Sequence, residues 1–80
     1  MYYVYVIQSL SHPNQHYTGI TENLNQRLQD HNEGRSVHTN KFKPWKVVVA
    51  IRFEDEKKAR AFEKYLKTGS GRAFMKRHFL

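Results

Sequence analysis

The sequence predicts an α+β fold, in which a small three-stranded antiparallel sheet is flanked by helices in the order β-β-α-β-α-α. Two short stretches rich in tyrosine and β-branched residues come first, and a turn-forming segment separates them. Two later stretches carry apolar residues at helical spacing, and a run of valine and isoleucine lies between them. With 80 residues, the chain is expected to form one domain, residues 1–80, with a small core.

The first two strands are expected at residues 1–10 and 15–20. In the first strand, aromatic and aliphatic residues alternate so that both faces are apolar, which predicts a central or covered strand. The segment between them, Ser-His-Pro-Asn-Gln, is typical of a turn, so the two strands are expected to form an antiparallel hairpin. Gly19 lies near the end of the second strand, where glycine permits a close backbone approach.

The first helix is expected to begin at Thr21, a favoured N-cap residue, and to end near Asn32, with Gly34 as the break. Leu24 and Leu28 are four residues apart and form its buried stripe.

The third strand is expected at residues 46–53, and its uninterrupted apolar centre predicts a strand covered on both faces. Asp55 is expected to cap the second helix, and Ser70 a short last helix. The second helix has apolar residues three and four apart, which form its buried stripe: Ala59, Phe62 and Leu66.

The charge balance favours an anionic partner. Fourteen Lys and Arg against seven Asp and Glu give a formal charge of +7, and from residue 57 onward Glu63 is the only acid. A small domain with this balance usually meets nucleic acid or an anionic surface, although a merely solvated basic face is the alternative. The chain has no cysteine, which excludes disulfides and predicts an intracellular, cytoplasmic location. The longest apolar run, residues 47–51, is too short to span a bilayer, so no membrane partner is expected.

The loop at residues 33–45 mixes basic and aromatic residues, a composition that suits phosphates and stacked bases. The alternative is a surface loop held on the core by Phe42 and Trp45, and for Trp45 this alternative is preferred. The basic residues expected to contact nucleic acid are Arg35, Lys41, Lys43, Arg72 and Lys76.

Five polar residues lie beside the predicted apolar stripes: Tyr5, Tyr17, Arg27, His31 and Glu63. Arg27 and His31 are four residues apart, which places them on one helix face. The set suits phosphodiester hydrolysis, because a guanidinium binds phosphate oxygens and a carboxylate with water ligands suits Mg²⁺. A tyrosine serves as a general base only where positive charge stabilises its phenolate. In the alternative interpretation the tyrosines belong to the core, and Glu63 pairs with Lys67 one turn further on.

At these positions the sequence resembles the GIY-YIG nuclease domain family. Tyr3-Val4-Tyr5 and Tyr17-Thr18-Gly19 are similar to the two tripeptides that name the family, and residues 24–31, 61–67 and 68–72 follow at matching spacing. The chain resembles the small stand-alone bacterial members, which are related to the N-terminal nuclease domain of the excision-repair subunit UvrC. The resemblance implies a metal-dependent endonuclease that hydrolyses DNA phosphodiester bonds. It also implies that such an enzyme would act in DNA repair or recombination.

The resemblance also implies a role for each residue of the set. Tyr17 would be the general base or would orient the attacking water, and Tyr5 would help to position water and phosphate. Arg27 would bind the scissile phosphate, and His31 would assist proton transfer. Glu63 would ligate a single Mg²⁺ or Mn²⁺ ion.

Two departures from the family pattern keep alternatives open. Several members carry a lysine directly after the second tripeptide, where this chain has Ile20, and many carry an asparagine downstream of the metal-binding glutamate, where this chain has none. One alternative is therefore a nucleic-acid-binding module with weak or no catalysis. The other is an interaction protein that is recruited to a repair complex through its basic helices.

Overall fold

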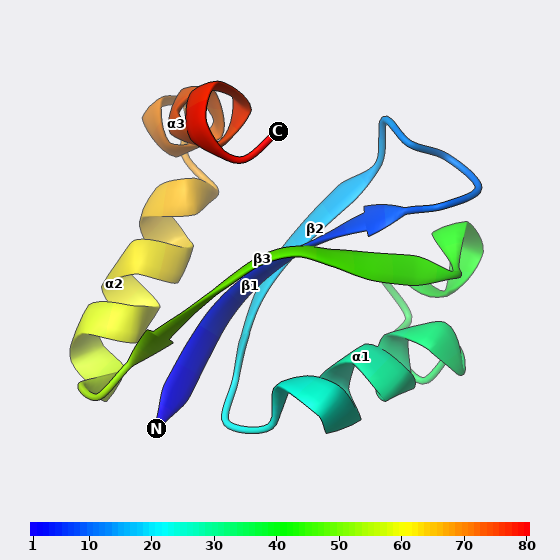
Figure 1. Cartoon of the computed structure of the whole chain (residues 1–80), viewed down its shortest axis with the longest axis horizontal. Coiled ribbons are helices and arrows are strands. Elements are labelled where there is room, and N and C mark those ends of the chain that lie inside the picture. Colours follow the sequence, from blue (N-terminus) through cyan, green and yellow to red (C-terminus); the bar gives the residue numbers. More distant parts are fainter.

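The computed structural model describes all residues, 1–80, and confirms the predicted element order (Figure 1). Its elements are β1 (Tyr2–Ser9), β2 (His16–Thr21), α1 (Leu24–Asn32), the 3-10 helix η1 (Asn40–Phe42), β3 (Trp45–Phe53), α2 (Glu56–Leu66) and α3 (Gly69–His78). The three strands form one sheet in the order β2-β1-β3, and both neighbouring pairs are antiparallel. No helix combines the length and the apolar character that crossing a membrane requires.

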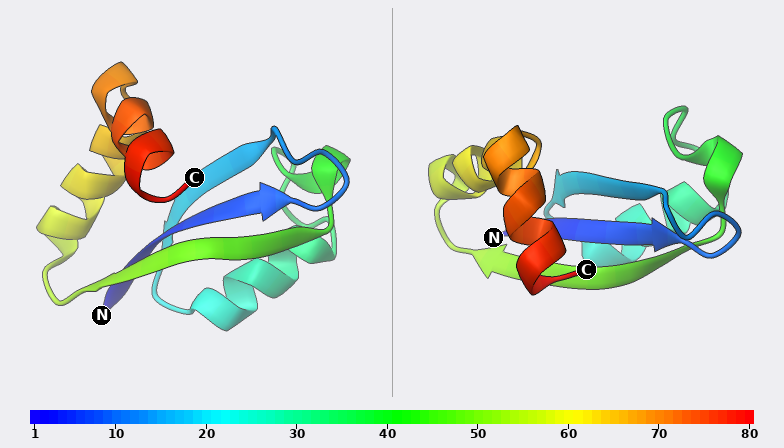
Figure 2. Two further views of the ribbon diagram at one scale, coloured as in Figure 1. Left: turned by 45° about the horizontal axis from the view of Figure 1, so that its top comes forward. Right: turned by 90° about the horizontal axis from the view of Figure 1, so that it is seen from above.

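The central strand β1 divides two apolar clusters, because alternate side chains point to opposite faces of a sheet. Val4 and Val6 pack on one side with residues of α2 and α3, and Tyr5 and Ile7 pack on the other with Trp45. Figure 2 shows the corresponding arrangement, with α2 and α3 gathered on one side of the sheet and α1 on the other. The prediction of a central first strand is confirmed.

The prediction that the third strand is covered on both faces is wrong. β3 is an edge strand, and its valine run, residues 47–49, is only half-buried, while Ala50 is exposed. The centre of the sheet is already taken by β1, which pairs with both of its neighbours, so β3 keeps one free edge. Trp45, at the start of β3, is buried with 4% of its surface exposed, which confirms that it holds the loop on the core.

Two of the three predicted helix caps are displaced. Thr21 is the last residue of β2, where it pairs with Tyr3, and the cap of α1 is Asn23, whose side chain accepts the Gln26 N–H at 3.1 Å. Thr21 Oγ1 instead accepts the Asn23 N–H at 3.1 Å and so shapes the turn before the helix. The strand therefore continues to the residue that the sequence suggested as a cap.

The cap of α3 is Thr68 and not Ser70. Thr68 Oγ1 accepts the Gly71 N–H at 3.1 Å and donates to the Tyr65 carbonyl at 2.6 Å, so it links the end of α2 to the start of α3. A Cβ at Gly71 would overlap the Tyr65 carbonyl and the Leu66 backbone, which explains the glycine there. Asp55 caps α2 as predicted, with its carboxylate 2.8 Å from the Lys57 N–H.

Candidate active site

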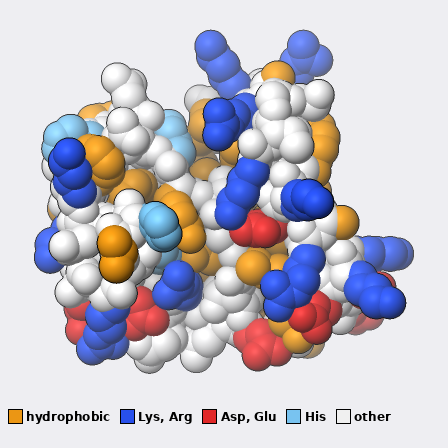
Figure 3. All heavy atoms as spheres, turned by 180° about the vertical axis from the view of Figure 1, so that it is seen from behind, with side chains coloured by type: hydrophobic (Ala, Val, Ile, Leu, Met, Phe, Trp, Pro, Cys, Tyr) orange, Lys and Arg blue, Asp and Glu red, His pale blue; other side chains and the backbone are white.

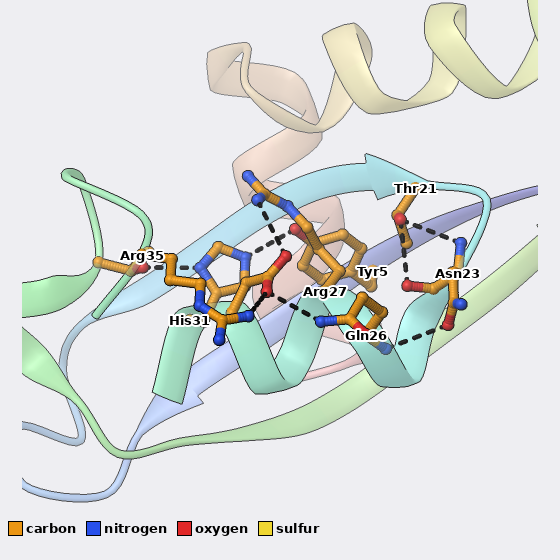
Figure 4. Close-up of polar contacts among 9 residues, drawn as sticks. Tyr5, Thr21, Asn23, Gln26, Arg27, His31 and Arg35 are labelled. Carbon is orange, nitrogen blue, oxygen red and sulfur yellow. Dashed lines mark hydrogen bonds and ion pairs between the residues drawn. The ribbon is translucent and has the colours of Figure 1, made fainter. Parts of the chain in front are cut away.

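Tyr5 lies at the centre of the sheet with only 1% of its surface exposed. It pairs with Gly19 on β2, and a Cβ at Gly19 would collide with the Tyr5 hydroxyl and ring. The glycine of the second tripeptide therefore makes room for the tyrosine of the first. This close approach fixes the direction of the Tyr5 ring across the edge strand, toward α1 (Figure 4).

The Tyr5 hydroxyl contacts His31, which projects from the last turn of α1 and is fully buried. The phenolic oxygen and Nε2 of His31 are 2.8 Å apart (Figure 4). On the far side of the ring, Nδ1 lies 2.6 Å from Oγ1 of Thr39, a buried residue of the loop before β3. The Trp45 indole N–H donates to the Thr39 carbonyl at 2.8 Å. The tryptophan therefore holds Thr39 in place beside His31.

The buried pair is uncharged at neutral pH. Burial raises the pKa of Tyr5 to about 12, although Arg27 opposes the rise by donating a hydrogen bond to the phenol and by its charge. Burial also lowers the pKa of His31, and the Arg27 guanidinium lowers it further. Arg27 can only donate, so the Tyr5 oxygen is the acceptor in its contact with the guanidinium.

Tyr17 completes a cluster of three rings on the same face. It lies opposite Ile7 in β2, and its ring centroid is 5.1 Å from that of His31 and 6.4 Å from that of Tyr5. Unlike Tyr5, Tyr17 is only half-buried, so its ring reaches the surface at the open edge of the sheet. The two tyrosines thus differ in their access to solvent.

Arg27 lies one turn before His31 on α1, as the spacing predicted. Its side chain is 37% exposed, and its one ion pair is a long one, 4.0 Å to Asp30. Asp30 is held mainly by shorter contacts, 3.1 Å from the Gln26 amide and 3.0 Å from Arg35 (Figure 4). Several guanidinium donors of Arg27 therefore remain available for the oxygens of a phosphate.

Glu63 approaches the cluster from α2. Its carboxylate lies 2.7 Å from the Lys67 ammonium, which confirms the pairing considered from the sequence, and its side chain is 19% exposed. The same ammonium lies 6.0 Å from the centre of the Tyr17 ring. Lys67 therefore contacts both the Glu63 carboxylate and the Tyr17 ring.

The residues around Glu63 suit a hydrated divalent ion that prefers oxygen ligands. No group of three or more His, Asp or Glu side chains lies close enough to form an all-protein cage. Mg²⁺ is commonly bound by one or two carboxylates while it keeps several waters, and Mn²⁺ also prefers oxygen ligands. A single carboxylate suits such a hydrated ion, whereas Zn²⁺ or Ca²⁺ would need more protein ligands.

The basic residues predicted to contact nucleic acid divide into two groups. Arg35 is engaged in ion pairs with Asp30 and Glu33, at 3.0 and 2.9 Å, and Lys41 lies 5.8 Å from the centre of the Phe42 ring. Arg72 and Lys76 are exposed on α3 and form no ion pair, whereas Lys43 is exposed in the loop. Figure 3 shows Lys and Arg side chains gathered over α2 and α3, the half of the molecule that carries Glu63.

A family model, the GIY-YIG catalytic domain, matches residues 1–78 of the chain. The chain belongs to this family. A search of curated proteins gives no match. Membership of the GIY-YIG family indicates nuclease activity of the endonuclease type, with DNA as the substrate. In this GIY-YIG domain the two tripeptides lie on neighbouring strands, so that Tyr5 and Tyr17 share one face of the sheet.

Two residues of the GIY-YIG site were not singled out from the sequence as functional. Thr39 gives no signal, because its contact with His31 depends on the path of an irregular loop. Lys67 stands four residues after Glu63, and this spacing predicted an ion pair but not its position over Tyr17. That position follows from the packing of α2 against β2.

Proposed function

We propose that this GIY-YIG domain is a metal-dependent endonuclease that hydrolyses DNA phosphodiester bonds. The observation that carries the proposal is the convergence of Tyr5, Tyr17 and His31, with Arg27 and Glu63 beside them. These side chains come from both tripeptide strands and from two helices, and they meet at the open edge of the sheet. We further propose that the chain works as a single domain in the cytoplasm, in DNA repair or recombination.

The proposed roles follow from the differences in exposure and hydrogen bonding. Arg27 is partly exposed with donors to spare, so it binds the oxygens of the scissile phosphate. Tyr17, which reaches the surface, acts as the general base or orients the attacking water. Tyr5 is buried and protonated, so it positions phosphate and water as a hydrogen-bond donor or acceptor. His31 forms a hydrogen bond with the Tyr5 hydroxyl and would assist proton transfer.

Glu63 is the residue that would hold Mg²⁺ or Mn²⁺. When bound, such an ion polarises the phosphate and stabilises the leaving oxygen. Lys67 would have to release the carboxylate for this, and ion pairs near the surface contribute no more than about 1 kcal/mol, so its release costs little.

One observation favours a second candidate, a nucleic-acid-binding module with weak or no catalysis. Glu63 is already paired with Lys67 at 2.7 Å, and the segment after α2 supplies no asparagine. In this candidate the basic surface of α2 and α3 binds the DNA backbone, and the affinity falls steeply with salt as counterions are released.

A cleavage assay separates the two candidates. Supercoiled, branched and single-stranded DNA are incubated with Mg²⁺, Mn²⁺ or EDTA, and Glu63→Ala is compared with Glu54→Ala, an exposed acid without contacts. The nuclease predicts metal-dependent cleavage that is lost in Glu63→Ala and kept in Glu54→Ala. Cleavage undiminished in Glu63→Ala would refute the metal role. Salt-sensitive binding without cleavage would establish the binding module instead.

A further inference from the structure

The largest hollow of the molecule adjoins the candidate active site and shares Tyr17 with it. It has a volume of about 580 Å³ and lies between the hairpin end of β2 and the helices α2 and α3. In Figure 3 it corresponds to the notch between the two halves of the molecule. Hollows of roughly 300–1,000 Å³ hold small ligands, so its size suits one nucleotide.

The hollow has an apolar floor and a polar, basic rim. Leu66 and Met75, which belong to the hydrophobic core, form the floor, and the exposed Leu80 adds apolar surface beside them. Thr18 donates a hydrogen bond to the Met75 sulfur at 3.7 Å, which holds the thioether under the opening. A flat aromatic base packs well against such a surface, because a thioether is polarizable and favours contact with aromatic rings.

The rim supplies groups for a phosphate and for the edge of a base. Arg72 lines the hollow from the first turns of α3, is exposed and has no ion pair. Asn14 and Gln15 line the opposite side from the hairpin and offer amide donors and acceptors. No Asp or Glu side chain lines the hollow, whereas Lys67 and Arg72 do.

Tyr17 and Lys67 connect this hollow to the site. Both residues line it, and both also touch the proposed catalytic cluster, Tyr17 through His31 and Lys67 through Glu63. The hollow and the proposed phosphate site at Arg27 therefore both adjoin Tyr17.

We propose that the hollow is a binding subsite for the nucleotide adjacent to the scissile phosphate, with its base on the Met75 floor and its own phosphate at Arg72. This subsite rests on the proposed nuclease function and adds a contact on one side of the cleaved bond. Arg72 binds substrate here and takes no part in the chemical step.

The test is an NMR titration of the ¹⁵N-labelled chain with the 5′-phosphorylated dinucleotide pdTdT, with deoxythymidine as the uncharged probe. We expect the amide signals of residues 14–18 and 72–80 to shift, and those of the loop at residues 33–43 to stay in place. Arg72→Gln should weaken pdTdT binding about tenfold, as expected when one charge-assisted contact is lost. Arg77→Gln is the matched control, because Arg77 lies on the same helix but lines a different hollow.

Cleavage of long DNA is measured in parallel, so that the two proposals can fail separately. Shifts confined to the hollow, with an affinity loss in Arg72→Gln alone, support the subsite. An equal loss in Arg77→Gln, or shifts centred on residues 33–43, would overturn it. If the protein cleaves DNA but pdTdT leaves the hollow unchanged, the subsite is wrong and the nuclease stands. If pdTdT fills the hollow but no DNA is cleaved, the nuclease is wrong and the chain is a binding module with this pocket.

Discussion

The Tyr5 hydroxyl and Nε2 of His31 lie 2.8 Å apart in the interior, and each is the hydrogen-bond partner of the other. No buried polar side-chain atom in the chain lacks a partner, so this pair is part of a fully satisfied interior. Removing either member therefore leaves a buried polar group alone, which is more costly than losing an exposed hydrogen bond.

Tyr5→Phe is expected to lower the free energy of unfolding by about 1–3 kcal/mol, because Nε2 of His31 loses its partner in the interior. Urea denaturation monitored by circular dichroism gives the value. Tyr3→Phe is the matched control, since Tyr3 lies on the same strand, is half-buried and forms no side-chain hydrogen bond, and it should change stability by less than about 0.5 kcal/mol. Equal effects of the two substitutions would show that the Tyr5–His31 contact contributes nothing.

His31 should make stability depend on pH in the mildly acidic range. Its pKa in the fold lies below the ordinary value of 6.5, because burial and Arg27 oppose its protonation. Below pH 6.5 the unfolded chain therefore binds more protons than the folded chain. The free energy of unfolding then decreases as the pH is lowered, until the pH is below the pKa of His31 in the fold. Urea denaturation between pH 7.5 and 5 should show this slope, and His31→Gln should flatten it. His38→Gln, which alters an exposed histidine, should retain the slope.

Gly19→Ala should destabilise the fold through a single clash. The new methyl group would overlap the Tyr5 hydroxyl and ring, and such overpacking typically costs about 1–3 kcal/mol. Tyr5→Phe in the same chain should recover part of the loss, because the hydroxyl is the closest clashing atom. Gly69→Ala is the control: its Cβ would meet nothing within 4 Å, so it should be neutral or stabilising by up to about 1 kcal/mol. Thermal unfolding of these three variants and of the unaltered chain measures these differences.

Lys67→Met should tighten Mn²⁺ binding if Glu63 is the metal ligand. The lysine occupies the carboxylate at 2.7 Å, and its positive charge opposes a nearby cation. If the ion pair with Lys67 contributes about 1 kcal/mol, its removal should raise the affinity for Mn²⁺ roughly fivefold. Electron paramagnetic resonance of free Mn²⁺ gives the dissociation constant directly. Lys64→Met, on the same helix but without an ion pair, should leave it unchanged, and Glu63→Gln should weaken it. An unchanged affinity in Lys67→Met would place the metal elsewhere.

The order of elements and the two helix faces could be anticipated from the sequence, because alternation and spacing of four are local rules. The grouping of Tyr5 with Tyr17 came from the resemblance to the family. Cap positions were less certain, since Thr21 can end a strand or cap a helix and the pairing with Tyr3 decides between them. Thr39 was beyond reach for a different reason. Its contact with His31 depends on where Trp45 anchors a loop that has no periodic pattern.

The free edge of β3 has a consequence for solubility. The half-buried valines at 47–49 form a short, strongly β-forming run on a strand whose outer backbone groups have no neighbour in the sheet. Such an edge can template the pairing of a second chain. Lys46 and Arg52 are exposed at either end of the run, so two edges brought together would repel each other. Positive charge at both ends of the run therefore opposes the joining of separate copies of this chain sheet to sheet.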